Sequence, residues 1–261
     1  MGALALEEIK AIKKYWLIWY TLGFQDIQLR YRRSALGPLW LTLSTAIMIY
    51  SMGFLYAYLF KLDLKTYFPY LASGVICWTF IVGLIKENSG AYINSEHYIR
   101  NQEPYYMIFI MRITFRNFII FCHNLLAFIP IALLFKTGIG INFLCIIPGL
   151  FLLGMNAILW GGVFSILSTR YRDIEQIIEN FMQVVFFVTP VMWMPSLLPA
   201  HMTWFYQWNP FAQFLMLIRN PLMNQPITLH ALCMVSLLTV IGFVLYVLHM
   251  DRYKHKIIFW L

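Results

Sequence analysis

Side chains able to take part in bond chemistry are few in this sequence, and they group in one polar stretch. Glu87, Glu96, His97 and Glu103 fall within or beside residues 86–103. Carboxyl groups and a histidine at one membrane face could act as general acid and base. The same stretch is long enough for a short helix that binds a protein partner, and a solvated loop is a third interpretation.

Sequence motifs for nucleotide and metal chemistry are missing. There is no G-x-x-x-x-G-K-[ST] phosphate loop, no G-x-G-x-x-G and no H-E-x-x-H. The cysteines, Cys77, Cys122, Cys145 and Cys233, lie in apolar runs and lack the spacing of a metal site or a disulfide framework. We therefore expect no catalytic residue, no metal and no cofactor in this chain, so an ATP-driven role would require a separate ATPase subunit.

The elements that hold these residues are apolar segments about as long as a bilayer is thick. They cover residues 36–60, 67–85, 115–135, 143–167, 177–195 and 229–250. A helix of about 20 apolar residues crosses the hydrocarbon core. Hydrophobic residues make up 61% of the chain and charged residues 11%, the reverse of a soluble domain. The sequence predicts an all-α integral membrane protein with six transmembrane helices.

Basic residues are distributed unevenly between the two sides of these spans. Most of the 19 Lys and Arg residues fall on one side, and only Lys61, Lys65, Lys136 and Arg219 fall on the other. Because cytoplasmic loops are enriched in Lys and Arg, this asymmetry places both termini in the cytoplasm. It also explains the net charge of +8 without nucleic acid.

The N-terminal segment is too polar to span a membrane. Apolar and aromatic residues between positions 6 and 20 recur at helical spacing, with lysines on the other faces. This pattern is typical of an amphipathic helix in the membrane interface, and a solvated cytoplasmic helix is the alternative. We divide the chain into an N-terminal cytoplasmic segment, residues 1–35, and a six-span domain, residues 36–261.

Residues 190–226 are apolar and aromatic but contain repeated prolines. A single spanning helix could not keep its backbone bonded through them. We expect short helices that enter the outer leaflet and return, forming a re-entrant outer cap between spans 5 and 6.

Ionisable groups are nearly missing from the spans, which disfavours ion-coupled transport. His123 and Asn124 in the third span are the main exceptions. A polar contact between helices is favoured for them over a proton relay.

Taken together, these segments resemble the membrane subunits of type-2 ABC exporters that move O-antigen, capsule or teichoic-acid polymers on lipid carriers. The matching pieces are the amphipathic N-terminus, RYRRSALGPLW at residues 30–40, RYRDI at 170–174, and WNPF at 208–211 followed by Arg219. Their order and the chain length also fit, so the resemblance extends over nearly the whole chain.

The resemblance implies that the polar stretch after the second span couples to the ATPase, with Glu96, His97 and Arg100 as contacts. ATP and Mg would then be bound by that partner subunit.

The resemblance also makes the N-terminal helix a lateral gate for a lipid-linked sugar. Arg30, Arg32 and Arg33 would then lie where the lipid pyrophosphate passes, because guanidinium groups suit phosphate oxygens. The alternative is that these arginines only set the orientation and contact lipid phosphate.

A path for a sliding polymer needs weak sugar contacts, which aromatic faces supply. Tyr50, Phe54, Tyr58 and Trp78 lie in or near the first two spans and are the candidates. Six helices leave little room for a glycan, so we place the channel at a homodimer interface.

The resulting hypothesis is a homodimeric permease that works with two cytoplasmic ATPase subunits. It would export undecaprenyl-linked O-antigen polysaccharide across the bacterial inner membrane, in contact with membrane lipids. A type-2 permease for capsule, teichoic acid, a lipid or a drug is the first alternative. A membrane-embedded enzyme of glycolipid synthesis and a passive channel are the others.

Overall fold

The structure is a computed structural model that describes residues 2–30, 32, 34, 36–37, 39–102, 105–137 and 140–261. The predicted all-α architecture is confirmed, because these residues form helices and turns with no β-strand among them. The α-helices are α1 (Ala3–Lys14), α2 (Trp16–Arg30), α3 (Leu39–Leu59), α4 (Leu64–Ser89), α5 (Glu96–Gln102), α6 (Met107–Leu125), α7 (Phe128–Phe135), α8 (Ile146–Arg170), α9 (Asp173–Val188), α10 (Trp204–Gln207), α11 (Pro210–Leu222) and α12 (Leu229–Trp260). Four 3-10 turns in the described residues are η1 (Ile93–Ser95), η2 (Ile141–Cys145), η3 (Pro195–Leu197) and η4 (Ala200–Met202).

Within the described residues, five segments are long and apolar enough to cross a membrane. They are Leu39–Leu59, Leu64–Ser89, Met107–Phe135, Ile141–Arg170 and Leu229–Trp260. The predicted span over residues 177–195 corresponds to α9, which has 16 residues and ends at Val188. Its predicted end was wrong because Thr189 precedes Pro190 and adopts an extended backbone, as residues before proline prefer. The count of six spans stays a prediction.

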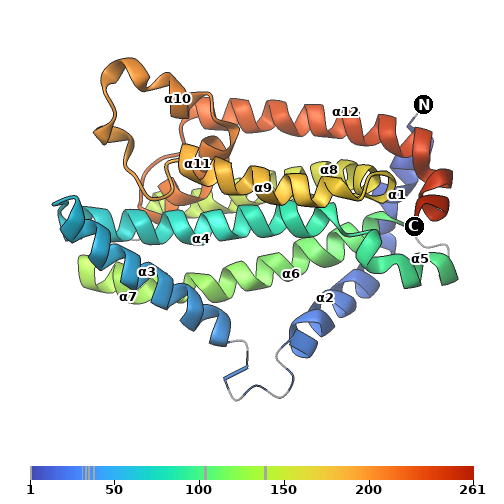
Figure 1. The fold of residues 1–261 in the computed structure, drawn as a ribbon, viewed down its shortest axis with the longest axis horizontal. Coiled ribbons are helices and arrows are strands. Elements are labelled where there is room, and N and C mark those ends of the chain that lie inside the picture. Colours follow the sequence, from blue (N-terminus) through green and yellow to red (C-terminus); the bar gives the residue numbers. More distant parts are fainter. Residues whose placement is uncertain are drawn as a thin grey trace.

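The two ends of the bundle differ in what they carry (Figure 1). Both chain termini, α1 and α5 lie at one end, which we call the terminal end. The other end, which we call the distal end, holds α7, α10 and the turn that joins α3 to α4. Lys61 lies in the turn between α3 and α4, Lys65 at the start of α4 and Lys136 directly after α7, so all three lie at the distal end, as the charge asymmetry predicts. Which end faces the cytoplasm stays a prediction.

Helix α4 lies at the centre of the bundle. It contacts α3, α6, α7, α8, α9 and α11, and it has the largest buried share of the five span candidates. The neighbouring α3, in contrast, leaves most of its surface uncovered. The buried part of α4 forms the main apolar core, from Tyr67 to Leu84.

Helix α8 packs closely on α4 and α12 because glycines stand at the contacts. A Cβ on Gly162 would lie 2.6 Å from a ring carbon of Tyr246 on α12, closer than real side chains approach. One residue earlier, a Cβ on Gly161 would lie 2.8 Å from Cβ of Asn88 on α4. Small residues allow membrane helices to approach in this way.

The N-terminal segment forms two helices instead of one, with a break at Tyr15. Small and charged residues face the bundle, since Ala5, Glu8 and Ala11 are buried. The large apolar side chains of the same segment point away from it, Trp16 and Leu17 among them, more than half exposed. Such an outward apolar face suits the interfacial position expected from the sequence.

The glycine contact on α8 gives a matched pair of variants. Gly162→Ala should lower the stability of the protein by about 1–3 kcal/mol, the usual range for overpacking. A Cβ added at Gly154 on the same helix would meet no other described helix within 4 Å, so Gly154→Ala should raise stability by up to about 1 kcal/mol through helix propensity. Thermal unfolding in detergent measures both, and equal melting temperatures would contradict the close approach of α8 and α12.

Candidate functional site

The predicted ATPase contacts lie together on α5 at the terminal end (Figure 1). Ile99 is fully buried and holds this short helix against the bundle, while His97 and Arg100 are exposed. Arg100 Nε donates to Glu96 Oε1 at 2.7 Å within the helix. The helix therefore presents a mixed-charge surface to the space beyond the bundle, and its use as a coupling contact stays a prediction.

The predicted pyrophosphate arginines follow directly on α2. Arg30 is its last residue, and its Nη2 lies 3.8 Å from Glu87 Oε1 on α4. Arg32 is exposed, and Arg33 lies outside the described residues. At that distance the Arg30–Glu87 pair is weak, and the role of Arg30 in binding pyrophosphate stays a prediction.

An ion-pair network behind Arg30 attaches α2 to α6, and the sequence did not single it out. Asp26 of α2 accepts from Arg112 Nε at 2.8 Å and Nη2 at 2.5 Å, and from Arg116 Nη1 at 2.8 Å. Arg116 Nη2 in turn donates to Glu87 Oε2 at 2.8 Å. Gly23 allows this contact, because a Cβ there would lie 3.0 Å from the Arg112 carbonyl. An acid within a segment otherwise rich in Lys and Arg was the available signal.

Helix α1 is attached to the last helix of the chain. The fully buried Glu8 lies 2.9 Å from Lys254 Nζ on α12, and it accepts the Met107 N–H at 3.1 Å. Asp251 of α12 accepts N–H bonds from Gly2 and from Ala5, the latter at 3.3 Å. Burial raises the pKa of Glu8 above its ordinary value, and Lys254 only partly opposes this shift.

The four path candidates do not form one cluster within a single chain. Tyr50 and Phe54 both pack on Phe68, with ring centroids at 5.6 and 5.2 Å. Tyr58, farther along α3, is 78% exposed. Trp78 is buried in the main core. The four residues therefore do not line one surface of this chain, and their role in a path stays a prediction.

The polar residues of the third span contact another helix. Thr45 Oγ1 on α3 donates to Asn124 Oδ1 at 3.0 Å. Thr42 Oγ1 donates to the His123 carbonyl at 2.8 Å, and the His123 ring lies against the Ile119 carbonyl. The helix contact favoured by the sequence is confirmed for the Asn124 side chain, whereas the His123 side chain bonds within its own helix.

Side chains from α4 and α11 bond the irregular backbone that follows α9. Tyr70 donates from its hydroxyl to the carbonyls of Pro190 and Trp193, both at 3.0 Å. Arg219 Nη2 donates to the same Pro190 carbonyl at 2.6 Å. The Tyr67 hydroxyl donates to the Met192 carbonyl at 3.1 Å. Short helices follow, as expected for residues 190–226, and their depth in a membrane stays a prediction.

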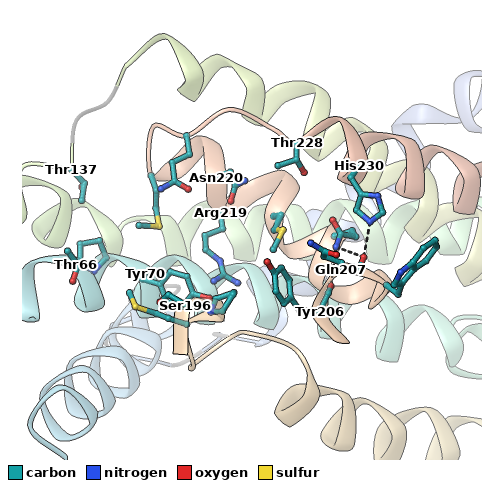
Figure 2. Close-up of a pocket in the computed structure, with 18 of the residues that line it drawn as sticks. Thr66, Tyr70, Thr137, Ser196, Tyr206, Gln207, Arg219, Asn220, Thr228 and His230 are labelled. Atoms are coloured by element: carbon teal, nitrogen blue, oxygen red, sulfur yellow. Dashed lines mark hydrogen bonds between the residues drawn. The ribbon is translucent and has the colours of Figure 1, made fainter. Parts of the chain in front are cut away.

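A large pocket opens beside this backbone at the distal end (Figure 2). Its volume is about 900 Å³, within the roughly 300–1,000 Å³ of small-molecule sites. We call it the distal pocket. The lining residues labelled in Figure 2 are Thr66, Tyr70, Thr137, Ser196, Tyr206, Gln207, Arg219, Asn220, Thr228 and His230.

The described carboxylates of the candidate acid and histidine group each pair with a basic side chain. Glu87 faces Arg116 and Asn117, whereas Glu96 pairs with Arg100, and Glu103 lies outside the described residues. In the part of the chain that the structure describes, no three His, Cys, Asp or Glu residues could hold one metal ion.

Comparison with known families assigns the chain to one of them. A model of the ABC-2 type transporter family matches residues 18–223, most of the chain. This chain belongs to the ABC-2 type transporter family. It is therefore the permease component of a transporter, a multi-pass integral membrane protein whose family works with an ABC ATPase.

Two curated relatives of this ABC-2 permease are both named O-antigen export system permease protein RfbA, from Klebsiella pneumoniae. One is 22% identical over 247 residues, which cover 87% of this chain and 90% of the relative. The other is 20% identical over 221 residues, which cover 78% and 83%.

The motifs that carried the resemblance have defined local roles in this ABC-2 permease. Asn209 caps α11, accepting the Phe211 N–H at 2.9 Å, and Pro210 stands in the first turn, where proline costs no hydrogen bond. In the turn between α8 and α9, Arg172 Nη2 donates to the Leu261 carbonyl at 3.3 Å. Both motifs therefore fix the start of a helix or the position of a turn.

The Asp26 ion pairs should contribute to stability by holding α2 against α6. Asp26→Asn should lower stability by about 3 kcal/mol, because Arg112 and Arg116 lose the carboxylate that neutralises them in a largely buried site. Asp63→Asn is the matched control, since the Asp63 side chain makes no capping bond, and it should change stability by less than about 0.5 kcal/mol. Limited proteolysis between α2 and α3 should become faster in Asp26→Asn alone.

The raised pKa of Glu8 predicts a pH effect of defined sign. A carboxyl whose pKa is higher in the folded than in the unfolded state takes up a proton on folding, so its contribution to stability grows as pH falls. The melting temperature of the unaltered protein minus that of Glu8→Gln should therefore rise from about pH 8 to about pH 5. A difference that stays constant or shrinks would show that the Glu8 pKa is not raised.

Proposed function

We propose that this permease is the channel-forming subunit of an ATP-driven exporter of undecaprenyl-linked O-antigen polysaccharide across the bacterial inner membrane. The observation that carries the proposal is similarity to two O-antigen export permeases over 87% and 78% of the chain. The assignment of the cargo rests on those relatives, and the features below are compatible with it.

The proposed topology has six spans and both termini in the cytoplasm. Its support is the placement of both termini, α1 and α5 at one end of the bundle (Figure 1). Helix α9 is the fifth span, about 24 Å long at 1.5 Å per residue, and the irregular segment after it completes the crossing.

The proposed channel lies between two copies of the chain. Helix α3 leaves most of its surface uncovered. On α9 the exposed side chains Ile177, Phe181 and Val184 recur at helical spacing along one face. Two copies that meet along α3 and α9 would bring Tyr50, Phe54 and Tyr58 of each copy to one central path, whereas Trp78 lies in the main core of its own chain.

The proposed energy source is a pair of cytoplasmic ABC ATPase subunits that bind ATP and Mg, while this chain binds no cofactor and catalyses no bond chemistry. Helix α5 would transmit their movement through Glu96, His97 and Arg100. The support is that this surface is exposed at the terminal end of the bundle, the end that also holds α1 and both termini (Figure 1).

The proposed entrance for the lipid carrier lies beside α2, at Arg30, Arg32 and Arg33. The outward apolar face of α2 would contact the acyl chains, and the arginines would bind the pyrophosphate. Arg30 supports this because its pairing with Glu87 is long.

Deletion of the gene in its own organism tests the cargo. Lipid-linked O-antigen should accumulate on the cytoplasmic face and disappear from the surface, and a plasmid copy should restore it. Unchanged surface O-antigen would refute the proposed cargo and favour a different one, while loss of polymer synthesis itself would favour an enzyme.

Arg100→Ala tests the coupling contact. Loss of an exposed pair within one helix costs only about 0.3–0.5 kcal/mol, so folding should be unchanged. The amount of ATPase that copurifies, and export, should both fall. Lys256→Ala is the control, because Lys256 is exposed on α12 near the C-terminal end. Equal copurification of ATPase with both variants would refute the role of α5.

A further inference from the structure

The distal pocket carries positive charge. Lys65 and Arg219 belong to its lining, as does His230, and the described lining residues include no Asp or Glu. Arg219 is only 3% exposed, and in the part of the chain described by the structure it forms no ion pair with an acid. A buried charge is costly unless it is paired. A negatively charged ligand could supply the partner that the Arg219 guanidinium lacks.

The contacts of Arg219 leave part of its guanidinium unused. Its Nη2 donates to the Pro190 carbonyl, and its Tyr70 contact places the guanidinium carbon 4.2 Å from the ring centroid. Among the described residues its buried Nε has no hydrogen-bond partner, and neither has the buried Thr137 hydroxyl. Arg219 therefore lies in the wall with part of its guanidinium unused, and Figure 2 shows it beside Tyr70 and Ser196.

The rest of the lining suits a sugar. Tyr206 and Trp208 place aromatic rings at the pocket, and such rings pack on apolar faces. Asn220 adds an amide that can bond hydroxyl groups. A volume of about 900 Å³ leaves room for several sugar units.

We propose that the distal pocket binds an acidic saccharide, a short run of sugar units of which one carries a carboxylate or a phosphate. Arg219 and Lys65 neutralise the anionic group, and Tyr206 and Trp208 hold the neighbouring ring. This assignment is independent of the proposed cargo, since it rests on the lining alone.

Binding to the purified full-length chain tests the site. The protein is placed in nanodiscs of phosphatidylcholine and titrated calorimetrically with trigalacturonate, and separately with its neutral methyl ester. The acid should bind at least about tenfold more tightly than the ester, because a charge-assisted bond to a buried guanidinium is lost with the carboxylate. Equal binding of the two, or no binding of the acid, would overturn the proposal.

Variants assign the binding to this pocket. Arg219→Gln should weaken trigalacturonate about ten- to a hundredfold, while its amide can still bond the Pro190 carbonyl. Lys65→Gln, at an exposed position that cannot affect packing, should weaken it several-fold. Lys61→Gln is the matched control, since Lys61 is a distal lysine outside the lining. If Lys61→Gln weakens binding as much as Lys65→Gln does, the loss of affinity comes from the overall positive charge of the distal end, and the proposal fails.

A lipid headgroup is the competing occupant. Replacing part of the phosphatidylcholine by anionic phosphatidylglycerol should leave trigalacturonate affinity unchanged if the pocket is a saccharide site. A loss of affinity that disappears in Arg219→Gln would instead assign the pocket to a lipid phosphate. The binding measurements do not involve transport. A negative binding result therefore does not refute the export proposal, and a negative result in the gene deletion does not refute binding to the pocket.

Discussion

A backbone that leaves the helical conformation between membrane helices must bond its carbonyl groups to protein. After α9 this requirement is met by side chains from other helices: Tyr67 and Tyr70 from α4, and Arg219 from α11. These bonds satisfy the carbonyl groups that follow the end of α9 and connect that segment to α4 and α11. They also bring a buried guanidinium to the wall of the distal pocket, so the chemistry of that pocket follows from how the backbone is satisfied.

Helix α4 joins the two polar regions of the molecule. Near its distal end Tyr70 bonds the segment after α9, and near its terminal end Glu87 bonds Arg116 and Asn117 of α6. The two positions are about 25 Å apart along a helix that rises 1.5 Å per residue. Between them α4 is packed on nearly all sides, so a shift of this helix would disturb both regions at once.

The sequence predicted those features that depend on local pattern. Apolar length located the membrane helices, and repeated prolines located the short helices after α9. The end of α9 at Val188 was missed although Thr189-Pro190 was a sufficient signal. The break at Tyr15 had none, since apolar spacing continues through it.

Features that depend on pairing between distant segments were beyond the sequence. The positive-inside rule used Arg112 and Arg116 only as charges, and nothing local indicates that Asp26, 86 residues from Arg112, lies between them. Trp78 gives a second example. The sequence does not distinguish an aromatic residue that faces a path from one that packs in the core, and Trp78 packs in the core of its own chain. The acidic saccharide site was missed because its lining comes from four separate segments.

The attachment of α1 to α12 has a consequence for biogenesis. The ribosome makes Glu8 well before Lys254. Until α12 is inserted, Glu8 has no partner on that helix and Gly2 and Ala5 lack the Asp251 carboxylate. Chains interrupted before Asp251 thus hold α1 only through its other contacts, such as the Glu8 bond to the Met107 N–H, so complete docking of the first helix reports that α12 is in place.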